Sequence, residues 1–148
     1  MFHTIVLALD GSEGADRAIP TAAALAAREE ARVVVAHAQT RALETDINAR
    51  LARQIHDLRT AGIDAEVITA ASVLVGREAD AIAQIADDCN ADMIVIAGRG
   101  RSPFVGAVLG SVTQRLLHVT NRPVLVIPPS DNAMQEREPD QQTTTAVN

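Results

Sequence analysis

The segment TIVLALDGSEG, residues 4–14, decides the fold. Thr4–Leu9 is an unbroken run of β-branched and aliphatic residues, which is typical of a strand buried on both faces. The polar residues 10–14 predict a turn, and an alanine-rich stretch with apolar positions at spacings of three and four follows to Glu30. Pro20 lies inside this stretch and predicts a bend or a frayed first part. The chain therefore begins as a strand, a turn and a helix.

The same alternation continues to residue 127. Four further apolar runs predict strands, at Arg32–His37, Asp64–Thr69, Met93–Ala97 and Pro123–Ile127. Three stretches of helical periodicity separate them, at Leu43–Leu58 with Gly62 as the stop, at Gly76–Asp88 and at Ser111–Val119. Strands joined through helices run parallel with right-handed crossovers. The sequence predicts an α/β fold: a doubly wound five-stranded parallel sheet in the order 3-2-1-4-5 with helices on both faces, a Rossmann-like three-layer sandwich.

Composition indicates one globular domain. Of the 148 residues, 47% are hydrophobic and 22% are charged, which excludes disorder of the whole chain and fibrous repeats. We expect residues 1–129 to form the domain. Residues 130–148 are polar and have no apolar period, so we expect them to be a disordered tail.

Charge, aromatic content and cysteine content exclude several classes of protein. The net charge of -6 has the wrong sign for tracking duplex phosphates, and Phe2 and Phe104 alone cannot form a base-stacking platform. No basic leader or long apolar run predicts a signal peptide or a membrane span. The single cysteine, Cys89, fits a reducing compartment and is interpreted as a small hydrophobe. We expect a cytoplasmic protein with no nucleic-acid or membrane partner.

Ligands of such a sheet bind between the carboxyl ends of the first and fourth strands. The segment after the fourth strand holds half of the eight glycines within thirteen positions, namely Gly98, Gly100, Gly106 and Gly110. Glycine lets backbone N–H groups turn toward phosphate, and Gly110-Ser111 opens a helix, where the dipole favours an anion. The alternative is that these residues are only a helix start and turns.

Other polar residues leave more than one role open. Asp10 could cap the first helix or accept hydrogen bonds from ribose hydroxyls. Arg99 and Arg101 could pair with phosphate or remain solvated. His37 is expected to be packed or hydrogen-bonded, and it is too far from His118 for a recognisable metal pair. We predict no metal site and no catalytic residue.

Three motifs resemble the universal stress protein family, and the resemblance covers residues 2–128. They are IVLALDGS at 5–12, ADMIVI at 91–96, and the spacing Gly100-x9-Gly110-Ser111. The family's nucleotide-binding branch carries Gly-x2-Gly-x9-Gly-Ser/Thr. This sequence departs from that motif at the first glycine, which falls on Ala97, with Gly98 directly after it.

The resemblance implies a site for ATP with Mg²⁺. It implies that Asp10 contacts the ribose and that Ala38 lies beside the adenine. It also implies that Gly110-Ser111-Val112 binds the phosphate chain and that Gly100 lies near the phosphates. The motif residues before Gly100 are then part of the same site, namely Ala97, Gly98 and Arg99.

Two functions compete. The first is a regulatory protein of the stress response that binds an adenine nucleotide and is not an enzyme, because no acid–base group is legible beside Asp10. The second is a nucleotide-free dimeric interaction module in which the glycine-rich loop is structural. In either case we expect a homodimer through the last strand, because an apolar sheet edge is usually paired or covered.

Overall fold

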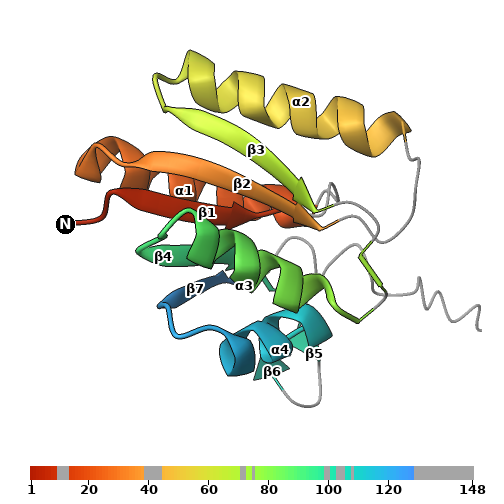
Figure 1. Cartoon of the computed structure of the whole chain (residues 1–148). Coiled ribbons are helices and arrows are strands. Elements are labelled where there is room, and N and C mark those ends of the chain that lie inside the picture. The colour runs from red at the N-terminus through yellow and green to blue at the C-terminus, as the bar shows by residue number, and fades with distance from the viewer. Residues whose placement is uncertain are drawn as a thin grey trace, which may run out of the picture.

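Strands and helices alternate along the chain, as the periodicity predicts (Figure 1). The computed structural model describes residues 1–9, 14–38, 45–70, 73–74, 76–98, 101–102, 106–107 and 109–128. The strands are β1 (Thr4–Ala8), β2 (Arg32–Ala38), β3 (Ala65–Ala70), β4 (Met93–Ala97), β5 (Arg101–Ser102), β6 (Gly106–Ala107) and β7 (Val124–Ile127). The helices are η1 (Ala15–Arg17), α1 (Ala18–Glu29), α2 (Thr45–Thr60), α3 (Glu78–Asp88) and α4 (Ser111–Val119).

The main sheet has the order β3-β2-β1-β4-β7, and all of its strand pairs are parallel. This confirms the doubly wound α/β fold and the order 3-2-1-4-5. The register places Ala8 opposite Ala36 on one side and Ile96 on the other, so β1 lies between β2 and β4 at the carboxyl edge.

Two apolar clusters cover the two faces of the sheet. In Figure 1, α1 lies behind the sheet and α3 lies in front of it. Alternate residues of β1 separate accordingly: Ile5, Leu7 and Leu9 pack with α1 and α2, while Val6 and Ala8 pack with α3 and α4. We call these two faces the α1/α2 side and the α3/α4 side. Because both faces of the central strands are buried, β1 and β4 are apolar almost throughout, whereas the edge strand β3 carries the exposed Glu66.

Three local features explain where the element bounds fall. Pro20 is the third residue of α1, where a missing N–H costs no intrahelical bond, and the irregular part comes earlier, as the short 3-10 helix η1. Gly62 ends the turn after α2 with a φ of +81°. Gly76 has a φ of +86°, which a helical residue cannot adopt, so α3 begins at Glu78 rather than at Gly76.

The glycine-rich segment holds a small feature that the sequence does not predict. β5 and β6 pair as an antiparallel two-residue ladder, with Arg101 opposite Ala107. Two-residue strands are too short for a period of two to be visible in a sequence. Asp10, Leu43, Arg99, Gly100 and the predicted tail lie outside the described residues.

None of the described helices has the length and apolarity that crossing a bilayer would demand.

Candidate functional site

The predicted crevice lies at the carboxyl edge of the sheet. β1 and β4 are neighbours and run in the same direction, so the chain leaves both strands at that edge. Ala38 ends β2, Ala97 ends β4, and Gly98 follows it directly. Gly110-Ser111-Val112 forms the start of α4. The crevice residues Asp10, Arg99 and Gly100 belong to the part of the chain that the structure leaves undescribed.

The α3/α4 side of this edge is lined by alanine. Ala8, Ala36 and Ala38 all pack in the cluster on that side, and Val112 of α4 packs in the same cluster. Ala8 and Ala36 are buried, while Ala38 is only partly covered. We call Ala8, Ala36 and Ala38 the alanine patch. Elsewhere these strands carry mostly Val, Ile and Leu, so the side chains on this side become smaller toward the carboxyl edge.

Sequence reasoning missed two members of this patch. Ala8 and Ala36 lie directly opposite each other in the β1–β2 register. The signal available was the change from β-branched residues to alanine at the last positions of both strands. That signal has meaning only once the two strands are known to be neighbours.

Ala97, which replaces the first glycine of the family motif, lies on the other side of the sheet. Its methyl group packs against the cluster on the α1/α2 side. Positive φ values among the described non-glycine residues occur only at Glu30 and Asn90, so Ala97 is not strained. The methyl group therefore neither distorts the backbone nor covers the alanine patch.

Gly98 packs closely against β7. Its N–H donates to the Ile127 carbonyl at 2.8 Å, and a Cβ on it would lie 3.3 Å from Val126 Cγ1. Its φ is outside the left-handed region. A side chain at this position would therefore be in tight contact with Val126, and the glycine does not supply the conformational freedom that a left-handed turn needs.

The start of α4 is open to an anion. Gly110 is the N-cap residue, with a φ of -63° and a ψ of 161°, and no side chain caps the helix. No acidic residue occupies the first turn, whereas α3 begins with Glu78 and has Asp80 in its first turn. Ser111 is exposed. The first N–H groups and the positive end of the dipole are therefore not compensated by the helix's own side chains.

The residues that directly follow β1 and β4 are held by side chains of other elements, β2 and η1. His37 is 3% exposed, and its Nδ1 hydrogen-bonds to the Leu9 carbonyl at 3.0 Å. Because a carbonyl only accepts, Nδ1 carries the hydrogen. Arg17 Nη2 donates to the Gly98 carbonyl at 2.5 Å. The expectation of a packed, hydrogen-bonded His37 is confirmed, whereas sequence reasoning did not single out Arg17.

Neither metal nor thiol chemistry is apparent among the described residues. They include no group of three His, Cys, Asp or Glu side chains suited to a metal ion. Cys89 packs at the α3/α4 side, and its Sγ lies 3.7 Å from the Ala86 carbonyl. Burial raises the pKa of this thiol, although Arg32 acts in the opposite direction. A raised pKa keeps the thiol protonated and unreactive, in agreement with a small hydrophobe.

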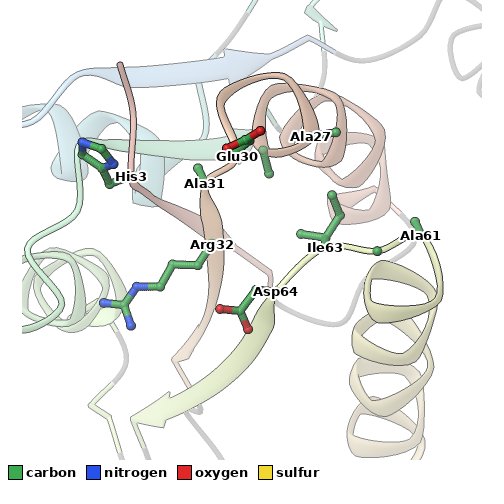
Figure 2. Close-up of a pocket in the computed structure, with 10 residues that line it drawn as sticks. His3, Ala27, Glu30, Ala31, Arg32, Ala61, Ile63 and Asp64 are labelled. Atoms are coloured by element: carbon green, nitrogen blue, oxygen red, sulfur yellow. The ribbon is translucent and has the colours of Figure 1, made fainter.

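Another pocket lies at the opposite edge of the sheet (Figure 2). It has a volume of about 500 Å³, and Arg32, Ile63 and Asp64 are among the residues that line it. Arg32 donates to Thr4 Oγ1 and to the Cys89 carbonyl, and it pairs with Glu66 at 3.5 Å. These bonds tie β1, β2 and β3 to the end of α3, so the arginine has a structural role there.

The order of the strands, with β1 and β4 adjacent, defines a doubly wound α/β protein, and the start of α4 has no side-chain cap. Residues 1–128 match the universal stress protein family. The chain belongs to this family.

Individual relatives cover nearly the same length. A Thermus aquaticus protein, the universal stress protein in the QAH/OAS sulfhydrylase 3′ region, is 35% identical over an alignment of 136 residues, which covers 86% of this chain and 99% of the relative. A solved universal stress protein in complex with cAMP is 28% identical with a TM-score of 0.65, covering 87% of this chain and 98% of its own. The Archaeoglobus fulgidus universal stress protein in complex with dAMP is 27% identical with a TM-score of 0.63, covering 86% and 98%.

Proposed function

We propose that this universal stress protein binds an adenine nucleotide, ATP with Mg²⁺, in the crevice between the carboxyl ends of β1 and β4. Binding would change the surface offered to a partner, and the protein would act as a regulator of the stress response in the cytoplasm. The observation that carries the proposal is that the alanine patch and the start of α4 share one side of the sheet.

In this arrangement the base and the phosphate chain of a nucleotide would contact different parts of the crevice. Adenine is a flat heteroaromatic ring, and it would lie against Ala38, the only partly covered member of the alanine patch, because Ala8 and Ala36 are themselves buried. The phosphate chain would lie at Gly110, Ser111 and Val112, where the start of a helix without a side-chain cap favours an anion. Relatives with similar sequence and fold hold cAMP and dAMP, which supports an adenine nucleotide. The spacing from Gly100 to Gly110-Ser111 supports a triphosphate, through the family resemblance.

In this proposal the protein regulates by binding the nucleotide and does not catalyse a reaction on it. His37 lies near the carboxyl end of β2, but its Nδ1 is engaged by the Leu9 carbonyl, and its Nε2 is buried without a partner among the described residues. No described side chain at the crevice therefore combines a free base with access to a ligand, which argues for binding rather than catalysis.

A second candidate function is the nucleotide-free dimeric module. β7 is an edge strand, and all four of its residues are apolar and only half-buried. Such an edge favours pairing with another copy of the chain. We propose a homodimer through β7 in either case, and nucleotide binding decides between the two functions.

Calorimetry and thermal unfolding test the proposal. At 100 times its Kd, a ligand of the folded state stabilises it by about 2.7 kcal/mol, which is several degrees for a domain of this size. We expect this shift with Mg-ATP, a smaller one with AMP, and none with GTP. Protein purified without added nucleotide should also release adenine nucleotide in mass spectrometry.

A pair of variants tests whether the heat of binding and the thermal shift depend on the alanine patch. Ala38→Leu fills the patch at its partly covered position and should abolish binding. Ala23→Leu adds the same side chain at a half-buried position of α1 on the other side of the sheet, and binding should persist. If millimolar Mg-ATP gives no heat and no shift with the wild-type protein, the nucleotide proposal fails and the dimeric module replaces it.

A further inference from the structure

Arg17 links the two walls of the crevice. It lies in η1, which follows β1 in the chain, and its guanidinium donates to the Gly98 carbonyl, which follows β4. We propose that Arg17 is a positioning residue that makes the site selective for phosphorylated ligands over the free nucleoside. This inference rests on the proposed nucleotide function and names the residue that sets its preference.

Gly98 is the last described residue before Arg99 and Gly100, and it is held at both polar atoms. Its N–H donates to the Ile127 carbonyl at 2.8 Å, and its carbonyl accepts from Arg17 Nη2 at 2.5 Å. The first bond continues the β4–β7 ladder and fixes the direction in which the strand ends. The second holds the Gly98 carbonyl, the last backbone group before Arg99 in the glycine-rich part of the sequence.

η1 is itself anchored from a second element. Asp16 accepts a hydrogen bond from Gln54 and pairs with Arg50 at 3.2 Å, and both partners belong to α2. Ala15 packs in the cluster on the α1/α2 side. The backbone that carries Arg17 is therefore fixed on one side by α2 and by the core, so its guanidinium can hold Gly98 in one place.

The charge of Arg17 is not neutralised within the described residues. No described carboxylate forms a salt bridge with it, and its Nε is buried without an acceptor there. The neighbouring Asp16 is already engaged by α2. By contrast, Arg32, Arg77, Arg115 and Arg122 each pair with a carboxylate. A fixed cation at the base of the loop favours an anionic ligand and is indifferent to a neutral one.

The test compares ATP and adenosine on the same variants. Arg17→Gln keeps a neutral donor but removes the charge and the planar fork, and we expect it to weaken ATP binding by about tenfold. Adenosine binding should change by less than about twofold, which lies within the spread of small contact changes. Arg17→Lys keeps the charge without the fork and should recover part of the ATP affinity.

Arg122→Gln is the matched control. Arg122 donates to the Ala91 carbonyl at the amino end of β4, a bond of the same kind at the opposite edge of the sheet. Because this variant also removes the ion pair with Asp87, we expect it to lower thermal stability at least as much as Arg17→Gln, and to leave the ratio of ATP to adenosine affinity unchanged. If Arg17→Gln does not fold, the ratio of ATP to adenosine affinity is measured on Arg17→Lys instead, and a ratio lower than that of the wild-type protein supports the role of Arg17.

The outcomes separate the inference from the function on which it rests. If the wild-type protein binds neither ATP nor adenosine, the proposed function fails, and this inference fails with it. If the wild-type protein binds ATP but Arg17 variants weaken both ligands equally, or neither, the function stands and the role of Arg17 is overturned.

Discussion

Replacing Gly110 with aspartate should stabilise the fold and abolish nucleotide binding. Gly110 has the extended conformation of an N-cap residue, and no side chain caps α4. Aspartate is preferred over glycine at an N-cap by a few tenths of a kcal/mol, and a negative charge at a helix start adds about 0.3 to 1 kcal/mol. The sum of about 1 kcal/mol corresponds to roughly 3 to 5 °C in Tm for a domain of this size.

The same carboxylate would oppose the phosphate chain. Two unit charges about 6 Å apart repel by about 2.8 kcal/mol at an effective dielectric constant near 20, which is roughly a hundredfold in Kd. The new side chain would also accept hydrogen bonds from the N–H groups that the phosphate needs. Stability and affinity should therefore change in opposite directions, which general damage to the fold cannot produce.

Gly110→Asn is the control for charge, because it caps the helix with a neutral side chain of the same shape. Differential scanning fluorimetry without ligand and calorimetry with Mg-ATP measure both quantities on the three proteins. Asparagine should raise Tm slightly and lower the affinity for ATP by less than about tenfold. This effect is smaller because only steric and hydrogen-bond competition remain, without charge repulsion. Equal loss with both variants would refute the electrostatic argument, and a lower Tm with aspartate would refute the open N-cap.

Four further outcomes are expected. Leu116→Ala should cost about 2 to 5 kcal/mol of unfolding free energy in urea, because Leu116 is fully buried and holds α4 on the sheet. Hydrogen bonds from the His3 and Thr4 N–H groups hold the pKa of Asp92 below its ordinary value, so its contribution should be present above about pH 4 and be lost as the pH falls through the lowered pKa. The stability gap to Asp92→Asn should accordingly shrink between pH 7 and pH 2.5, and an unchanged gap would contradict this. Light scattering should give twice the chain mass of 15.6 kDa at micromolar concentration if β7 pairs, and a single-chain mass would refute the dimer. Removal of residues 130–148 should leave Tm nearly unchanged, whereas a fall of many degrees would show that the tail docks on the domain.

The class and order of the elements could be predicted from the sequence because they depend on local pattern. β4 and α4 have the predicted bounds, Met93–Ala97 and Ser111–Val119. A strand buried on both faces must be apolar throughout, and a helix must repeat its apolar positions at three and four, so each type is visible in its own segment. The spacing from Gly100 to Gly110-Ser111 is equally local, and it indicated the phosphate end of the site.

Contacts between distant segments could not be predicted in this way. Arg17 and Gly98 are 81 residues apart, and their bond exists only because η1 packs beside the end of β4. The sequence suggests that Gly98 is a source of conformational freedom, but its φ is not left-handed, and the structure instead shows Val126 of β7 in close contact with this position.

The side of the sheet on which each residue lies was also decided by tertiary structure. A period of two shows that neighbouring residues of a strand point to opposite faces, but it does not show which pair of helices covers each face. Only the packing of α4 places Val112 on the same side as Ala38, and only the packing of α1 and α2 turns the Ala97 methyl group away from both. The sequence alone predicts that glycines and a helix start follow the fourth strand, and the assembled layers decide on which side of the sheet each described side chain lies.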